Sequence, residues 1–238
     1  MARQEISFRD LGRMEYQQAW DLQEQLLQKN IGRKMLVQPF VAEDHEEPAT
    51  EHHLLFVEHP PVYTLGKSGH IGNVLINEEE MYARGIQFFR TNRGGDITFH
   101  GAGQIVGYPI LDLEKFSTDI GKYLRNLEEV IILTLAEYGI VGERSAGETG
   151  VWIEPGIPGR GRKICAIGVR CSRWITMHGF ALNVNTDLSF FDHIIPCGIQ
   201  EKQVTSIEKE LGSKTNIEAV KESVKKNFAW VFEAEIRS

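Results

Sequence analysis

The chain has 238 residues, of which 42% are hydrophobic and 25% charged, and its 26 basic and 33 acidic residues give a formal net charge of −7. This composition is typical of a globular protein and excludes a disordered chain, a collagen-like fibre and a disulfide scaffold. The negative charge argues against a general nucleic-acid-binding protein, because such proteins neutralise phosphates with Lys and Arg. The three cysteines, and the lack of an apolar leader or of 18 consecutive apolar residues, predict a reduced protein of the cytoplasm that enters no membrane.

The N-terminal part begins with a strand or turn over residues 6–11, and apolar side chains then recur at helical spacing from Tyr16 to Gly32. Two apolar strands are expected over 35–41 and 54–57. Residues 43–52 are acidic, contain a proline and lack periodicity, which indicates an exposed loop. The histidines of this loop have no usual metal-ligand spacing, so no metal site is predicted.

The middle of the chain combines helices with short strands. Asn77 precedes three glutamates, which predicts the N-cap of a short helix that ends at Gly85. A long amphipathic helix is expected from Ile120 to Gly139. Further strands are expected over residues 86–89, 105–111, 151–153, 164–169 and 175–184.

The C-terminal part is predicted to be helical. Thr205 and Glu208, and likewise Thr215 and Glu218, have the spacing of capping boxes. One helical face then carries the apolar residues Ile217, Val220, Val224, Phe228, Val231 and Phe232.

Strands and helices are mixed along the chain and do not alternate regularly. This order favours an α/β fold of the α+β kind, in which helices flank a mixed sheet, over a doubly wound fold. No repeat or linker divides the sequence, so residues 1–238 are expected to form a single domain.

Glycine is concentrated in Arg93–Gln104, where four glycines allow a close approach of the backbone to a ligand. The dinucleotide fingerprint fails here, because Val106 occupies the place of its third glycine and a strand follows. The P-loop pattern also fails, since Pro61 stands where Gly66-Lys67-Ser68 would need an upstream glycine. The segment is therefore either a glycine-rich hairpin or a ligand loop bracketed by Arg93 and His100.

Residues 155–186 contain no Asp or Glu but hold four arginines and Lys163. This local charge fits either a basic, solvated hairpin or a docking surface for an acidic partner. The string Gly159–Lys163 is superficially similar to the adenylate-binding loop of biotin ligases.

The three cysteines differ in their context. Cys165 lies in an apolar strand, where it is expected to be a small core residue, and Cys171 ends that strand without a clear role. Cys197 stands between Pro196 and Gly198, where a turn would present its thiol. It is a candidate nucleophile if a cation elsewhere in the chain lowers its pKa.

These motifs together resemble the lipoyl(octanoyl) transferases, which form protein-bound octanoyl-lysine, the precursor of lipoyl groups. The resemblance covers most of the chain. It runs from about His59–Gly66 to Cys197–Ile199. Its most specific parts are Arg93–Gln104 leading to Leu113, Lys163 with Ala166–Gly168, and His178–Asn183 running to Ile195–Gly198.

The resemblance implies the fold of the catalytic domains of biotin and lipoate protein ligases. It implies transfer of an octanoyl group from acyl carrier protein to a lysine of a lipoyl domain, in 2-oxoacid dehydrogenase E2 subunits or the glycine cleavage H protein. Cys197 would form the acyl thioester, and Lys163 would lower its pKa and carry the proton. The acyl pocket would be lined by Arg93, Gly94, Gly95, Asp96, Ile97, Thr98, Phe99, His100, Ala166, Ile167, Gly168, Gly179, Phe180 and Ala181. Phe99, Phe180 and Ile167 are candidate apolar walls.

A thioester donor conserves the activation of the acyl group, so no cofactor is required, and a monomer suffices. The sequence departs from the family pattern at Ala102, where a proline is usual, and in longer loops over 43–52 and 154–162. The alternatives are an ATP-dependent lipoate or biotin protein ligase, a non-enzymatic acyl-protein binding module, and a cysteine hydrolase that uses Cys197 with His178 or His100.

Overall fold

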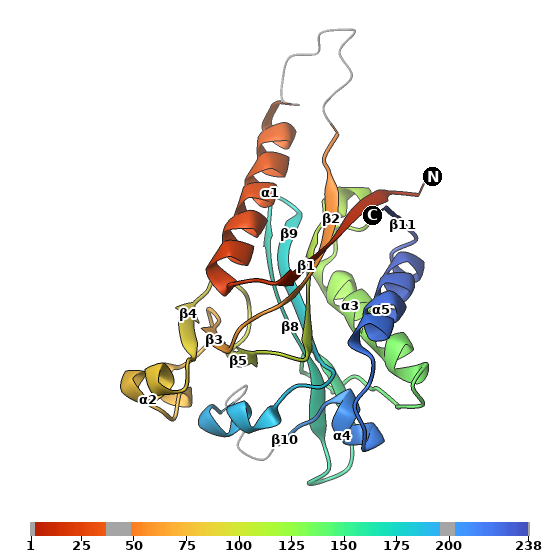
Figure 1. The fold of residues 1–238 in the computed structure, drawn as a ribbon. Coiled ribbons are helices and arrows are strands. Elements are labelled where there is room, and N and C mark those ends of the chain that lie inside the picture. The colour runs from red at the N-terminus through yellow and green to blue at the C-terminus, as the bar shows by residue number, and fades with distance from the viewer. Residues whose placement is uncertain (1–2, 37–48, 196–202, 238) are drawn as a thin grey trace, which may run out of the picture.

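The computed structural model describes residues 3–36, 49–195 and 203–237, and helices cover both faces of its large mixed sheet (Figure 1). Within these ranges the main sheet has eight strands. Their order is β10 (Gln203–Val204), β8 (Arg162–Ser172), β9 (Ile175–Asn183), β6 (Gln104–Ile110), β2 (His52–Glu58), β1 (Glu5–Arg13) and β11 (Glu235–Arg237), with β7 (Val151–Ile153) also paired to β8. Parallel pairs at both edges and antiparallel pairs between them confirm the mixed sheet expected from the sequence.

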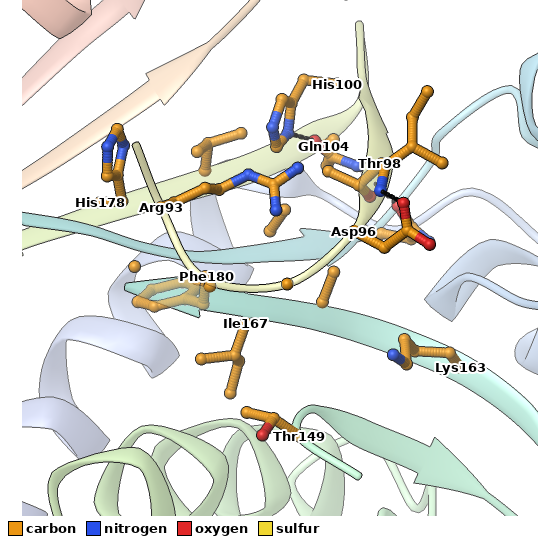
Figure 2. Close-up of a pocket in the computed structure, with 18 of the residues that line it drawn as sticks. Arg93, Asp96, Thr98, His100, Gln104, Thr149, Lys163, Ile167, His178 and Phe180 are labelled. Carbon is orange, nitrogen blue, oxygen red and sulfur yellow. Dashed lines mark hydrogen bonds between the residues drawn. The ribbon is translucent and has the colours of Figure 1, made fainter. Parts of the chain in front are cut away.

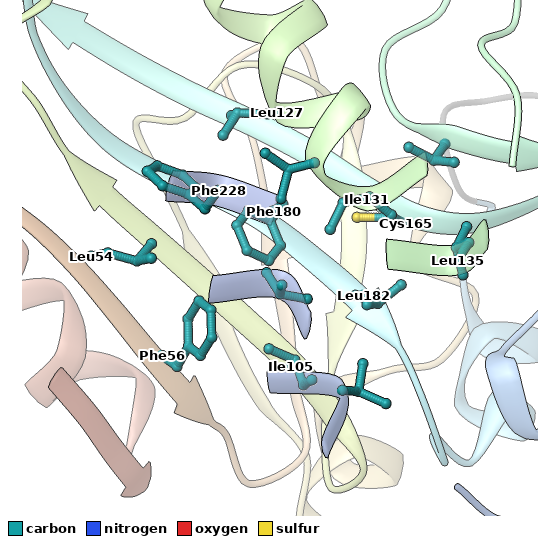
Figure 3. Close-up of a cluster of buried hydrophobic side chains, with 14 of the residues drawn as sticks. Leu54, Phe56, Ile105, Leu127, Ile131, Leu135, Cys165, Phe180, Leu182 and Phe228 are labelled. Carbon is teal, nitrogen blue, oxygen red and sulfur yellow. The ribbon is translucent and has the colours of Figure 1, made fainter. Parts of the chain in front are cut away.

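Two helices, α3 (Ile120–Ala136) and α5 (Ile217–Val231), cover one face of this sheet (Figure 1). Their apolar faces pack on strand residues such as Phe56, Phe180 and Leu182, and Leu127 and Phe228 are fully buried among them (Figure 3). Each such side chain stabilises the fold by about 1.5–3 kcal/mol through burial. The helical periodicity of the sequence therefore identifies this core correctly.

Helix α1 (Tyr16–Leu36) covers the other face, and its buried surface is partly polar. Ala19 and Leu27 pack on the sheet, while Gln23 and Asn30 are buried at the same spacing. The Gln23 side chain donates to the Ala19 carbonyl and accepts the backbone N–H of His178 at 2.9 Å. These bonds satisfy the buried amide and tie α1 to β9, beside the site described below.

A small second sheet consists of β4 (Gln87–Arg90), β3 (Val62–Leu65) and β5 (Ile97–His100), next to the short helix α2 (Glu78–Ala83). The hairpin interpretation of Arg93–Gln104 is wrong, because β5 pairs with β3 and β6 pairs with β2 and β9. The turn at 101–103 thus sends the chain from one sheet to the other. Because β5 and β6 belong to different sheets, the loop 93–96 that precedes β5 lies over the main sheet.

Several element boundaries differ from the expectation. Met35 belongs to α1 and not to a strand, and His52 lies buried in β2 and not in an exposed loop. The rest of the expected strand at 37–41 and most of the loop 43–52 lie outside the described residues. Helix α4 (Ile207–Leu211) and helix α5 are capped by Ser206 and Asn216, one residue later than predicted, because these side chains reach the free backbone N–H groups.

In the part of the chain that the structure describes, no helix is long and apolar enough to cross a membrane.

Candidate functional site

A cavity of about 460 Å³ lies between the loop 93–98 and strands β8 and β9 (Figure 2). The loop is fixed to β8 by the backbone N–H of Gly94, which donates to the Val169 carbonyl at 2.9 Å. A β-carbon at Gly168 would lie 2.8 Å from the Gly94 carbonyl oxygen. Glycine at 168 therefore allows the loop to cross the strand and roof the cavity.

Most residues expected to form the acyl pocket line this cavity, although they come from both sheets. Of the fourteen, only Gly94 and Phe99 are not among the described lining residues. Gly94 instead contacts β8, and the Phe99 ring stacks on Phe190 in the core of the small sheet, with 4.6 Å between ring centroids. Phe180 lines the cavity but also packs on Phe56 beneath α3 and α5, so it serves both.

Arg93 is buried and its guanidinium holds the backbone of the site. It donates to the Gly94 and Thr64 carbonyls and to the Thr64 hydroxyl. Two of these bonds satisfy backbone carbonyls at the junction of the two sheets, and the third satisfies a side-chain hydroxyl there. Arg93 thus shapes the roof of the cavity by joining the loop to β3.

Lys163 lies at one end of the cavity, where β8 is paired on both sides. It pairs with Trp152 on β7 and Val204 on β10, and its carbonyl accepts the backbone N–H of Thr205 at 2.9 Å. Its Nζ lies 4.5 Å from the centroid of the Trp152 ring, a cation–π contact. These contacts fix the backbone and the ammonium group of Lys163 in the cavity wall.

The loop 147–149 lines the cavity beside Lys163 and depends on the fully buried Glu128 of α3. One carboxylate oxygen of Glu128 accepts the Gly150 N–H at 3.0 Å, and the other pairs with Arg125 and Arg144 at 2.7 and 3.1 Å. Gly150 has a φ of 119°, and a β-carbon there would lie 2.6 Å from the Cys165 carbonyl oxygen. A buried carboxylate, paired with two more exposed arginines, therefore holds the loop next to Lys163.

The proposed nucleophile, Cys197, lies outside the described residues. Phe191 and Val204, which flank it in the sequence, both line the cavity. The other two thiols are poor nucleophiles by their surroundings. Cys165 is fully buried in the main core, as expected, and burial raises its pKa. Burial also raises the pKa of the half-buried Cys171.

The other end of the cavity holds polar side chains, of which the sequence analysis named only His178 and His100, as partners of Cys197 in a hydrolase, and His100 also as a pocket residue. Tyr16, Tyr108 and His178 line this end, and His59 lies behind it. Nothing in the local sequence distinguishes Tyr16, Tyr108 or His59 as site residues. His59 and Tyr108 lie within the motifs that carry the family resemblance, but the resemblance assigns them no role. His100, which the sequence did single out, also lies here and its ring stacks on Tyr16.

Burial keeps the histidines at this end neutral. It lowers the pKa of His59 to about 4 and holds the pKa of His100 well below its usual range. Burial, with Arg93 and Arg170 nearby, lowers the pKa of His178 to about 3. Neutral imidazoles cannot supply charge to an acyl-transfer centre, which separates this end chemically from the Lys163 end.

The positive charge of the basic stretch 155–186 is partly neutralised in the fold by acidic residues from outside the stretch. Arg162 pairs with Glu154 and Glu210, both at 2.6 Å, and Arg160 pairs with Glu154 at 2.7 Å. Arg170 pairs with Glu24 of α1 at 2.8 Å. The expectation of a strongly basic docking surface is wrong for these three arginines, because the fold brings carboxylates to them from other segments.

No group of three or more His, Cys, Asp or Glu side chains within the described ranges could hold a metal ion.

Residues 15–229 match the model of the lipoyl protein ligase A/B catalytic domain family. The octanoyltransferase of Flavobacterium psychrophilum is 57% identical over 97% of this chain and 98% of its own length, and that of Christiangramia forsetii is 56% identical over 98% of each. The chain belongs to this family, among its octanoyltransferases. It is therefore an acyltransferase.

The fold agrees with this assignment. A solved bipartite lipoate protein ligase of Thermoplasma acidophilum has a TM-score of 0.69 to this structure, at 16% identity, over 100% of this chain and 87% of that one. The lipoate-ligase-like fold implied by the sequence motifs is thus confirmed.

Proposed function

We propose that the protein transfers an octanoyl group from octanoyl-acyl carrier protein to a lysine of lipoyl domains, through a thioester on Cys197. The acceptors are the lipoyl domains of 2-oxoacid dehydrogenase E2 subunits and the glycine cleavage H protein. The observation that carries the proposal is the place of Lys163, whose side-chain nitrogen lies in the wall of a cavity that Phe191 and Val204 also line. In the sequence these two residues stand on either side of Cys197.

One thiol exchange and one amine attack complete the cycle. The neutral amine of Lys163 takes the proton of the Cys197 thiol and becomes an ammonium group, and the thiolate attacks the donor thioester carbonyl. The carrier thiol leaves as the C–S bond breaks, and it takes that proton. The acceptor lysine amine then attacks the Cys197 thioester, Cys197 leaves as a thiolate, and the proton lost by the amine passes through Lys163 to that thiolate.

The cavity floor suits an unbranched alkyl chain. Gly168, Gly179, Ala166 and Ala181 are small residues of β8 and β9 that line it, and Ile167 adds an apolar wall. Burial of each CH₂ of the chain would stabilise the complex by about 0.8 kcal/mol. A short acyl chain can therefore be held by shape and burial alone.

The remaining expectations follow from this chemistry. A thioester supplies the activation, so the proposed reaction needs no ATP, metal or cofactor. We propose that the chain works in the cytoplasm as one catalytic domain and as a monomer, without nucleic acid or membrane.

Mass spectrometry of an acceptor lipoyl domain tests the proposal. The wild-type protein, octanoyl-acyl carrier protein and the domain are mixed without nucleotide, and one octanoyl group on the acceptor lysine is expected. Octanoylation only with ATP and free octanoate would show the alternative, an ATP-dependent ligase. In the structure, Glu154 and Glu210 already pair with Arg160 and Arg162 of the loop that such a ligase would place near phosphates.

A further inference from the structure

Two buried amide side chains lie next to each other in the wall of the cavity. Gln104 of β6 and Asn183 of β9 pair in the main sheet, are 1% and 4% exposed, and both line the cavity. Nε2 of Gln104 donates to Oδ1 of Asn183 at 2.9 Å. The proposed acyl transfer assigns no role to either amide.

Two backbone carbonyls fix the orientation of both amides. Nε2 of Gln104 also donates to the Phe99 carbonyl at 3.0 Å, and Nδ2 of Asn183 donates to the Thr205 carbonyl at 3.0 Å. Because a carbonyl only accepts hydrogen bonds, the amide nitrogens must face these two groups. Oε1 of Gln104 then accepts the Nδ1 hydrogen of His100 at 2.9 Å (Figure 2). Each amide is therefore held at both of its polar atoms.

Thr205 continues this series of hydrogen bonds to Lys163. It is fully buried and directly follows β10. Its backbone N–H donates to the Lys163 carbonyl at 2.9 Å, next to the pair formed by Val204 and Lys163. In the order of the sheet β8 lies between β9 and β10, so the bond from Asn183 to Thr205 bridges the strand that carries Lys163.

The pairing of β10 with β8 depends on such an anchor. Strand β10 has only two residues, fewer than most strands of globular proteins, so it contributes few ladder bonds of its own. On its other side Lys163 pairs with Trp152 of β7. If β10 were released, Lys163 would lie on a strand paired on one side only, and Val204, which also lines the cavity, would move with β10.

We propose that Asn183 is a positioning residue for Lys163 in the acyl transfer, and that Gln104 orients Asn183. This inference rests on the proposed function, in which Lys163 moves the proton. Asn183 holds the Thr205 carbonyl and Thr205 holds β10 against β8, so the Lys163 amine stays in one place over the Trp152 ring. Misplacement of a catalytic group by about 1 Å can slow a reaction about 100-fold.

Lysine NMR of the full-length protein tests the position of Lys163 without any transfer. Because Nζ lies 4.5 Å from the centroid of the Trp152 ring, the ring current shifts the signal of the adjacent Cε hydrogens. The signal is assigned by its absence in Lys163→Met. In Asn183→Ala it should move toward the position of an exposed lysine. Asn183→Asp keeps the bond from Gln104 but cannot donate to Thr205, so its signal should move in the same direction.

Asn185→Ala is the matched control. The Asn185 side chain also bridges to a backbone segment, since it donates to the Thr215 carbonyl at 2.8 Å and accepts the Thr215 N–H at 3.0 Å. Asn185 is not among the described residues that line the cavity, so Asn185→Ala should leave the Lys163 signal in place. A Lys163 signal that stays at the wild-type position in a folded Asn183→Ala or Asn183→Asp protein would overturn the proposal.

Single-turnover transfer shows whether Asn183 acts through Lys163. Asn183→Ala should slow transfer by the wild-type protein about 10- to 100-fold. It should slow Lys163→Met by less than about twofold, because the group that Asn183 positions is already gone. Equal slowing in both backgrounds would overturn the proposal. A wild-type protein that transfers no octanoyl group would contradict the proposed function alone, since the NMR signal still reports where Lys163 lies.

Discussion

The two ends of the cavity are built in different ways. At the Lys163 end, the ammonium group lies on a strand that is paired on both sides, next to a loop that the buried Glu128 fixes. At the His178 end, neutral imidazoles and tyrosines are held by hydrogen bonds that join His59 to β6 and β9 to α1. One end is therefore suited to proton transfer and the other to fixing the shape of the cavity, so substitutions at the two ends should have different consequences.

The largest effect is expected from the loss of the Lys163 amine. Lys163→Met keeps most of the side-chain volume but removes the acid–base group, so single-turnover transfer should slow by about 100- to 10,000-fold. Lys209→Met, at an exposed position of α4, is the matched control and should transfer at the wild-type rate. A Lys163→Met rate within tenfold of wild type would contradict the division between the two ends.

Removal of the Glu128 charge should be next in size. Glu128→Gln leaves Arg125 and Arg144 without their buried partner and weakens the bond to Gly150, so urea denaturation should show a loss of about 1–3 kcal/mol. Glu129→Gln removes an exposed carboxylate that pairs with the same Arg144 and should cost less than about 1 kcal/mol. Equal losses would show that burial of the carboxylate is unimportant.

The His178 end should make stability depend on pH. The pKa of His59 is about 4 in the folded protein against an ordinary value near 6.5, so the unfolded chain binds the proton more readily between these values. The free energy of unfolding should therefore fall as the pH is lowered from 6.5 to 4. In His59→Gln the slope should decrease by about 1.4 kcal/mol per pH unit.

Val224→Ala is the control for this slope, since it lowers stability without removing a titratable group. Urea denaturation at several pH values gives both slopes. An unchanged slope in His59→Gln would show that His59 is not held neutral by the fold.

The smallest effect is expected from the Trp152 ring. Trp152→Leu removes the cation–π contact, worth about 1 kcal/mol, so the single-turnover rate should fall about fivefold with little change in KM. Trp152→Phe retains an aromatic face and should recover part of the rate. Equal rates for the two variants would assign Trp152 to packing alone.

Much of the fold follows from local sequence, because periodicity and caps are local signals. Val220, Val224 and Phe228 recur on one face of α5 and are fully buried, and Asn77 caps α2 as predicted. The caps of α4 and α5 lie one residue beyond the predicted threonines, because Ser206 and Asn216 offer better acceptors.

The site is less predictable, because it depends on contacts between distant segments. The pairing of Lys163 with Trp152 and Val204 joins three parts of the chain, and His178 meets Gln23 across 155 residues. Likewise, no local pattern shows that Glu210 neutralises Arg162. The family motifs indicated Lys163 and most of the lining residues, but not the polar wall formed by Tyr108 and His178.

Intact mass spectrometry of the protein after mixing with octanoyl-acyl carrier protein tests the central claim most directly. We expect one octanoyl adduct that hydroxylamine removes, that is absent in Cys197→Ser and that forms more slowly in Lys163→Ala. Cys165→Ser alters a fully buried thiol and should retain the adduct if it folds. Full adduct formation in Cys197→Ser would contradict the assignment of Cys197 as the nucleophile.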